Sequence, residues 1–175
     1  MSLTIVGESI GKMEDLTTPT ATAQYKLGKI VVVEDTSTST RKEYMYVKSL
    51  SAGMTAYQPY VVTYGSTAGA EMITIVPFTL AANGSQVVVP QVAFTASYYG
   101  FVLIQGDGKV LMTSETYAVG DYLRAINAGT YLHVDGTSGA TTQSVNSCGI
   151  CKEAGSTAVA RKVFLFGNLS VIAAS

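Results

Sequence analysis

Few residues in this chain could do chemistry. His133 is the single histidine, and Cys148 and Cys151 are the only cysteines, spaced as C-G-I-C. A nucleophilic site needs a base beside a serine, threonine or cysteine, but His133 lies in an alternating apolar segment and Asp135 precedes a turn glycine. A zinc site needs four ligands, more than His133 and two cysteines supply. We therefore predict no catalytic residue, no metal and no cofactor.

The cysteine pair and the carboxylate pairs have simple structural interpretations. A redox-active C-x-x-C motif favours a helix N-terminus, whereas the residues around Cys148 and Cys151 have a strand pattern. We expect two buried thiols in a reducing compartment, with redox or metal chemistry as the alternative. The pairs Glu14–Asp15 and Glu34–Asp35 stand at strand or linker ends, where charges face solvent, so glycosidase chemistry is not favoured.

The segment 97–112, SYYGFVLIQGDGKVLM, carries the strongest structural signal. Residues 101–104 are apolar at every position, which is typical of a strand that lies inside a sandwich or at a subunit contact, and residues 163–166 repeat this pattern. We expect both segments to be buried in the core and between subunits. The G-D-G sequence at 106–108 favours a tight turn, because glycine adopts positive φ readily. We predict a β-hairpin over 97–112. No helix pattern follows the turn, which excludes a phosphate-binding loop.

Short apolar or alternating runs separated by turn residues occupy most of the chain, and helical periodicity is nearly absent. This pattern predicts an all-β protein, a sandwich or barrel of about ten short strands with an extended N-terminal arm. The expected strands lie within 28–35, 41–50, 57–65, 71–78, 83–94, 97–112, 119–126, 131–136, 144–154 and 161–167.

Three parts are expected along the chain. Residues 1–24 contain a Pro- and Thr-rich stretch with little to pack, which predicts an arm that is mobile alone and ordered on a partner. Residues 25–167 form the β-domain, with a possible subdomain break near Asn83–Gly84. Residues 168–175 form a C-terminal tail.

Composition and charge limit the partners. The chain has 175 residues, of which 47% are hydrophobic and only 13% charged, and its net charge is −1. No basic run could neutralise phosphates, so nucleic acid binding is not expected. No apolar stretch is long enough for a membrane helix, and no secretory leader is recognised. A surface poor in charge instead favours contacts with other protein subunits.

The chain has eleven tyrosines and no tryptophan. Strand alternation places Tyr44 and Tyr46 on one face between Lys42 and Lys48, and unpaired lysines are costly to bury. We therefore expect a half-exposed aromatic surface with a cationic rim, a composition that suits protein interfaces. The candidate protein-contact residues are Tyr44, Tyr46, Lys42, Lys48, Tyr98, Tyr99, and Leu3 and Ile5 on the arm.

The order of several short motifs resembles the small decoration, or cement, proteins of tailed-phage capsids. The residues that carry this resemblance are Leu27–Gly28, Tyr46–Val47–Lys48, Tyr99–Gly100–Phe101, Ile104, Gly106 and the run from Phe164 to Asn168. The resemblance covers roughly residues 27–168 and leaves the first 26 residues outside it.

The resemblance implies a non-enzymatic virion protein that binds the major capsid protein on the capsid exterior. It also implies a homotrimer assembled in the host cytoplasm. Two other functions stay open at this point. Exposed tyrosines lining a groove would favour a carbohydrate-binding or adhesion module on a virion, and ring formation would favour a tail-tube protein.

Overall fold

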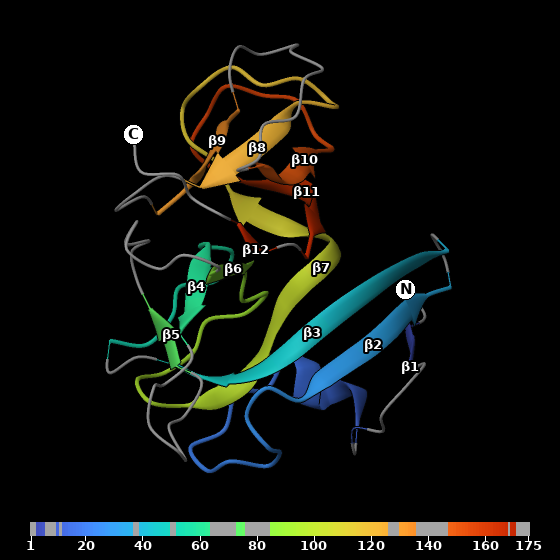
Figure 1. The fold of residues 1–175 in the computed structure, drawn as a ribbon, viewed down its shortest axis with the longest axis vertical. Helices are drawn as coiled ribbons and strands as arrows, with labels where there is room; N and C mark the ends of the chain where they lie inside the picture. Colours follow the sequence, from blue (N-terminus) through green and yellow to red (C-terminus); the bar gives the residue numbers. More distant parts are fainter. Residues whose placement is uncertain are drawn as a thin grey trace.

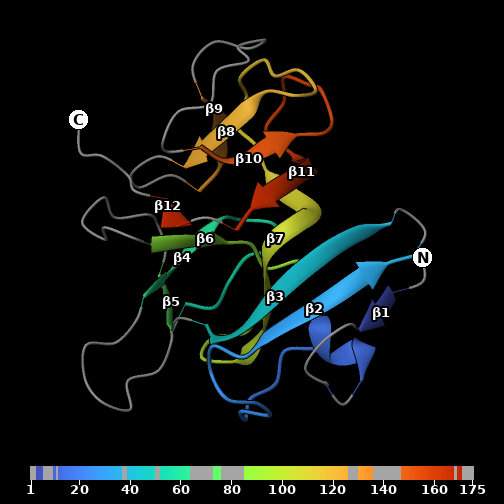
Figure 2. The same cartoon turned by 45° about the vertical axis from the view of Figure 1, so that its right-hand side comes forward.

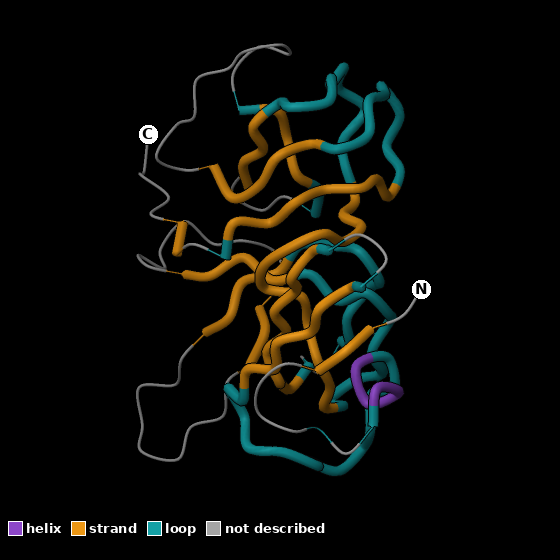
Figure 3. Tube along the Cα trace, turned by 90° about the vertical axis from the view of Figure 1, so that its right-hand side faces the viewer, coloured by secondary structure: helices purple, strands orange, loops and turns teal. Residues whose placement is uncertain are grey.

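The structure is a computed structural model that describes residues 3–5, 10, 12–36, 39–49, 52–63, 73–75, 85–125, 130–135, 147–167 and 169–170. These residues form strands, loops and one short 3-10 helix, η1 (Met13–Leu16), so the all-β prediction is confirmed (Figure 3). No helix in this part of the chain is long and apolar enough to cross a membrane.

Twelve strands are present in the described residues. They are β1 (Leu3–Ile5), β2 (Ile30–Asp35), β3 (Thr40–Lys48), β4 (Tyr60–Thr63), β5 (Ile73–Ile75), β6 (Ser85–Val88), β7 (Tyr99–Leu111), β8 (Tyr122–Ala125), β9 (Leu132–Val134), β10 (Ser147–Cys151), β11 (Ala160–Phe166) and β12 (Leu169–Ser170). Their order is β12-β6-β4-β5-β3-β7-β11-β10-β8-β9, with β2 and then β1 added beside β3. This order leaves open ends, so the sheet is not a closed barrel.

Strand β7 connects the two halves of the fold. It pairs antiparallel with β3 through Tyr99 to Gln105 and with β11 through Gln105 to Leu111. Figure 1 shows it passing from the β2–β3 region to the β8–β11 region and bending between them. The hairpin predicted over 97–112 is therefore wrong, because the chain continues as one strand of 13 residues.

Gly106 explains why a turn signal lies inside a strand. Its φ is +98°, and a Cβ atom there would lie 2.4 Å from the carbonyl oxygen of Arg41. The β3–β7 register also shifts between Glu43 and Tyr44, beside this point. The glycine supplies a bulge and a close backbone approach, which bend the strand without reversing it.

Two clusters of buried side chains lie on opposite faces of β3 and the first half of β7. Phe101 and Leu103 belong to the larger cluster, whereas Val102 and Ile104 belong to the smaller one. All four side chains are buried, which confirms the prediction for residues 101–104. The β-domain thus has a core on each side of its central strands. The possible break at Asn83–Gly84 lies outside the described residues.

The N-terminal segment packs on the rest of the chain. Ile10 and Leu16 are buried in the larger core, and Thr20 exchanges backbone hydrogen bonds with Tyr99 at 2.8 Å. Strand β1 pairs with β2, and η1 lies beside this pair (Figure 2). The expectation that this segment has little to pack is therefore wrong for these residues. Its role on a partner stays a prediction, as does the boundary at residue 24.

Candidate binding groove and aromatic face

A groove with a volume of about 660 Å³ opens near the point where β3 and β7 separate. The two strands are paired up to Glu43 and Gln105, and beyond this pair β7 continues beside β11 alone. The groove is lined by Thr17, Asp35, Lys42, Tyr44, Tyr57, Gln91, Asp107, Gly108, Lys109, Lys152 and Lys162. Its volume lies within the range of roughly 300–1,000 Å³ that is usual for ligand sites.

Three of these lysines form a row across adjacent strands, which we call the lysine row: Lys109, Lys162 and Lys152. Lys162 on β11 is the direct partner of Lys109 on β7. The amide of Lys152, just after β10, donates to the carbonyl of Lys162 at 2.9 Å. All three side chains are exposed. Residues paired across a sheet share a face, so the three ammonium groups project from one side of the sheet.

Positive charge exceeds negative charge in the groove, with four lysines against two aspartates. Lys152 pairs with Asp107 at 2.9 Å. The ammonium of Lys109 lies 5.9 Å from the centre of the Tyr57 ring. Within the described residues, Lys162 has no ion-pair partner. The excess charge is therefore concentrated on the opposed residues Lys109 and Lys162.

The opposite wall of the groove is fixed by a buried ion pair. Lys42 Nζ lies 3.4 Å from Asp35 Oδ2, and these side chains are only 12% and 1% exposed. Burial, and to a smaller extent the charge of Asp35, raises the pKa of Tyr44 to about 12. The Tyr44 hydroxyl therefore stays protonated at neutral pH and well above it.

Loops hold the free edge of β7 in place beside the groove. The side-chain amide of Gln91 accepts a hydrogen bond from the backbone N–H of Lys109 at 3.0 Å and donates one to the backbone carbonyl of Lys109 at 3.1 Å. It thereby satisfies this residue's backbone as a neighbouring strand would. The backbone carbonyl of Tyr57 accepts a hydrogen bond from the backbone N–H of Leu111 at 2.8 Å. Tyr57 has a φ of +66°, a conformation that costs a bulky residue energy and that clusters at functional sites.

An aromatic face, comprising Tyr122, Ile150, Phe164 and Phe166, continues from the lysine row. Ile150 is paired with Phe164 on one side and with Tyr122 on the other. The Phe166 ring centre lies 6.1 Å from that of Tyr122 and 6.5 Å from that of Phe164. These four side chains are half-buried. They form one contiguous apolar surface.

Strand β11 has one buried face and one half-exposed face. Val163 and Leu165 are buried in the larger core, whereas Phe164 and Phe166 are half-buried. The predicted burial of residues 163–166 in the core is thus confirmed for Val163 and Leu165. Burial of the other face against another subunit stays a prediction. Lys162, Phe164 and Phe166 alternate along the strand, so the lysine row and the aromatic face share one side of the sheet.

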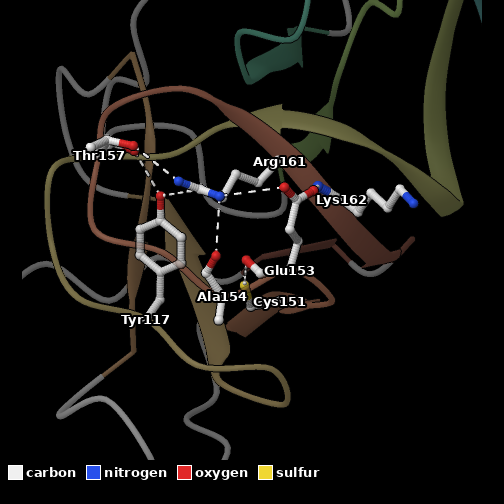
Figure 4. Close-up of polar contacts among 7 residues, drawn as sticks. All are labelled: Tyr117, Cys151, Glu153, Ala154, Thr157, Arg161 and Lys162. Atoms are coloured by element: carbon white, nitrogen blue, oxygen red, sulfur yellow. Dashed lines mark hydrogen bonds and ion pairs between the residues drawn. The ribbon is translucent and has the colours of Figure 1, made fainter.

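Arg161 fastens the loop between β10 and β11 that carries Lys152. Its guanidinium donates to the Tyr117 hydroxyl at 2.8 Å, the Ala154 carbonyl at 3.1 Å and the Thr157 hydroxyl at 3.0 Å (Figure 4). The Tyr117 hydroxyl in turn donates to the Thr157 carbonyl at 2.8 Å. These bonds give the end of the lysine row a defined position.

The structure corrects the predicted exposure of Tyr44 and Tyr46. They are 9% and 2% exposed and belong to the larger core. Their shared face was predicted correctly, but rings from elsewhere in the chain cover it: Tyr25 lies 5.3 Å and Phe101 lies 5.0 Å from Tyr46, centre to centre. The hydroxyl of Tyr46 accepts a hydrogen bond from the backbone N–H of Gln24 at 2.9 Å.

The other candidate contact residues are divided among different places. Lys42 joins Tyr44 at the groove. Lys48 lies over the Tyr99 ring at 5.4 Å, and Tyr99 stacks on Tyr46 at 6.4 Å. Tyr98 is half-buried. Leu3 and Ile5 pair through their backbones with Asp35 and Val33. A contact role for these residues stays a prediction.

The single histidine lies beside an acidic side chain. His133 Nδ1 lies 2.8 Å from Glu115 Oε1. Burial raises the pKa of Glu115, but hydrogen bonds from His133 and the Val134 amide, with the charges of His133 and Arg124, bring it below its ordinary value. In the described part of the chain, no three His, Cys, Asp or Glu side chains gather as metal ligands would.

Both cysteines are free and buried. Burial raises the pKa of the Cys148 thiol to about 12. Burial also raises the pKa of Cys151, whose sulfur donates to the carbonyl of Glu153 at 3.2 Å. The two thiols are thus protonated and poorly nucleophilic at neutral pH.

Sequence reasoning missed the lysine row and the aromatic face. The alternation of Lys162, Phe164 and Phe166 was available as a signal for a face with charge at one end and rings at the other. Lys109 and Lys152 had no such signal, because their position beside Lys162 depends on which strands pair.

Comparison with known proteins shows a structural likeness to a phage protein. No family model and no curated protein matches the chain. Among solved structures, the chain is similar to the N base of head fiber gp8.5 in bacteriophage phi29. The identity is 10%, the TM-score is 0.47, and the match covers 72% of this chain and 95% of that chain. At this level the likeness carries no functional inference.

Proposed function

We propose that this chain is a non-enzymatic structural protein of a phage virion that decorates the capsid exterior and binds across major capsid subunits. The motif order described above supports a decoration protein. The observation that carries the proposal is the aromatic face, where Tyr122, Ile150, Phe164 and Phe166 form a half-buried surface next to the lysine row.

The aromatic face has the composition of an interface centre. Tyrosine and phenylalanine are enriched at protein interfaces, and they bring a large area with few rotatable bonds. Each Å² of apolar surface removed from water contributes about 25 cal/mol. The neighbouring lysines, still solvated at the rim, add orientation and steer the encounter more than they add affinity.

A homotrimer would strengthen such attachment. Three linked copies of one face convert the second and third contacts into intramolecular events, which raises avidity without any new contact. The proposal therefore includes a trimer. Light scattering on the purified protein should give three times the chain mass of 18.3 kDa. A monomer mass would contradict the trimer and leave attachment to be tested alone.

Attachment can be tested by co-sedimentation with capsids of the encoding phage that lack this protein. The double substitution Tyr122→Ser/Phe166→Ser should weaken binding by up to about a thousandfold, since two anchor residues at about 2 kcal/mol each contribute about 4 kcal/mol together. Val159→Ser is the control, because Val159 is 43% exposed and lies in the loop between β10 and β11, outside the aromatic face. Equal binding by both variants would contradict the assignment of the aromatic face, and failure of the wild-type protein to sediment would contradict the capsid role.

A further inference from the structure

We infer that the lysine row and the aromatic face together bind an acidic, extended segment of the partner protein. In this arrangement carboxylates of the segment meet Lys109 and Lys162, and its apolar side chains pack on the rings of β11. The inference rests on the proposed function for the existence of a protein partner, and it adds the chemistry of the partner and the residues that recognise it.

The charges of the groove call for an anionic complement. Lys109 and Lys162 are direct cross-strand partners, and like charges in this position repel each other and destabilise the sheet. The Asp107 carboxylate pairs with Lys152, the third lysine of the row, at 2.9 Å. A carboxylate placed between Lys109 and Lys162 would relieve the repulsion and gain two charge-assisted hydrogen bonds.

The spacing along β11 favours a protein segment over a small anion. Lys162, Phe164 and Phe166 point to the same side at intervals of about 6.7 Å, which is the two-residue repeat of any extended chain. An extended partner segment with a carboxylate followed by apolar residues at alternate positions would match all three. A small anion would satisfy the lysines and leave the rings without a partner.

Nucleic acid fits the same surface less well than an acidic protein segment. The groove has an excess of only two positive charges, and the whole chain has a net charge of −1. Phosphate-driven binding normally depends on several neutralising side chains. In addition, the Asp107 carboxylate lines the same groove and would repel a continuous phosphate backbone.

The direct test uses a synthetic peptide with two glutamates at alternate positions followed by two leucines at alternate positions. A matched peptide has glutamine in place of glutamate. Calorimetry with the full chain at low salt should show the glutamate peptide binding about tenfold more tightly, with the difference shrinking as salt screens the lysines. Equal affinities for the two peptides, or no binding of the glutamate peptide, would overturn the inference.

Two double variants separate local from net charge. Lys109→Gln/Lys162→Gln should weaken binding of the glutamate peptide by about tenfold, because each partly exposed pair contributes modestly. Lys12→Gln/Lys26→Gln removes the same charge from exposed lysines outside the groove and should leave binding unchanged. Equal losses in the two variants would overturn the inference. A short thymidine oligonucleotide that binds as tightly as the glutamate peptide would also overturn it, by showing a general polyanion site.

The capsid assay distinguishes this inference from the proposed function. Wild-type protein that sediments with capsids while Lys109→Gln/Lys162→Gln sediments poorly supports both. Equal sedimentation of wild type and this variant retains the capsid role and overturns the acidic segment. If wild-type protein never sediments with capsids, the proposed function is contradicted, and the claim that the acidic segment belongs to a capsid protein fails with it. The peptide measurements still decide whether the surface recognises carboxylates.

Discussion

Replacing Gly106 by alanine should destabilise the protein much more than the same change at Gly120. Both glycines have a φ of +98°, so the backbone strain of an added Cβ is matched. They differ in surroundings. A Cβ at Gly120 would meet nothing within 4 Å, whereas one at Gly106 would lie 2.4 Å from Arg41 O and 3.0 Å from Lys42 Cα.

The two costs can be estimated separately. Positive φ costs an L-residue about 1–2 kcal/mol, and the reduced entropy of the unfolded chain offsets part of this, which leaves about 1 kcal/mol for Gly120→Ala. At Gly106 the obstructing atoms belong to the backbone of β3 and cannot rotate away. Relief requires β3 and β7 to move apart, an overpacking cost of about 1–3 kcal/mol more. We expect a total loss of about 3 kcal/mol for Gly106→Ala.

Urea unfolding followed by circular dichroism and tyrosine fluorescence would measure both losses, since the chain has no tryptophan. In thermal unfolding, the extra 2 kcal/mol at Gly106 corresponds to about 4–8 °C in Tm for a chain of this size. Equal losses for the two variants would refute the reasoning. That result would mean that β3 does not approach β7 at the bend, and it would favour a hairpin turn at 106–108.

Three further predictions concern the core and the hydrogen bonds that Arg161 makes to the loop between β10 and β11. Tyr46→Ser should cost about 3 kcal/mol in urea unfolding, because it removes a ring packed inside the core; unchanged stability with lost capsid binding would place this ring on the surface after all. Burial raises the pKa of Cys148 to about 12, so between pH 9 and 12 this thiol ionises in the unfolded chain before it does in the folded one. The free energy of unfolding should therefore fall with rising pH, by up to about 1.4 kcal/mol per pH unit. Cys148→Ala should reduce this slope, and identical slopes for the variant and the wild type would contradict the burial of the thiol. Arg161→Met should speed proteolysis of the loop between β10 and β11 and lower the free energy of unfolding by about 2 kcal/mol. Unchanged cleavage would show that the hydrogen bonds from Arg161 to Tyr117 and to the loop do not stabilise the fold.

The pleat of the backbone made some features predictable from sequence. Alternation placed Tyr44 with Tyr46 and Phe101 with Leu103, because successive side chains of any strand point to opposite faces. The same rule and the turn residues predicted the all-β class. These features depend only on residues close together in the chain.

Local patterns failed where distant residues decide the outcome. Gly106 carries a turn signal, but β3 and β11 pair on either side of it and the chain continues as one strand. The lysines at both ends of β3 suggested an exposed face, but Tyr25 and Phe101 cover Tyr46 from elsewhere.

By itself, the sequence determined that this chain forms short strands with alternating faces, since strand geometry repeats every two residues and requires no distant partner. Tertiary structure alone decided which faces are covered and which charges meet. Lys109, Lys152 and Lys162 become neighbours only because β7, β11 and β10 pair in one particular register. A shift of one residue in that register would turn the row to the other side of the sheet, because pairing across strands is a property of the assembled sheet and not of any one strand.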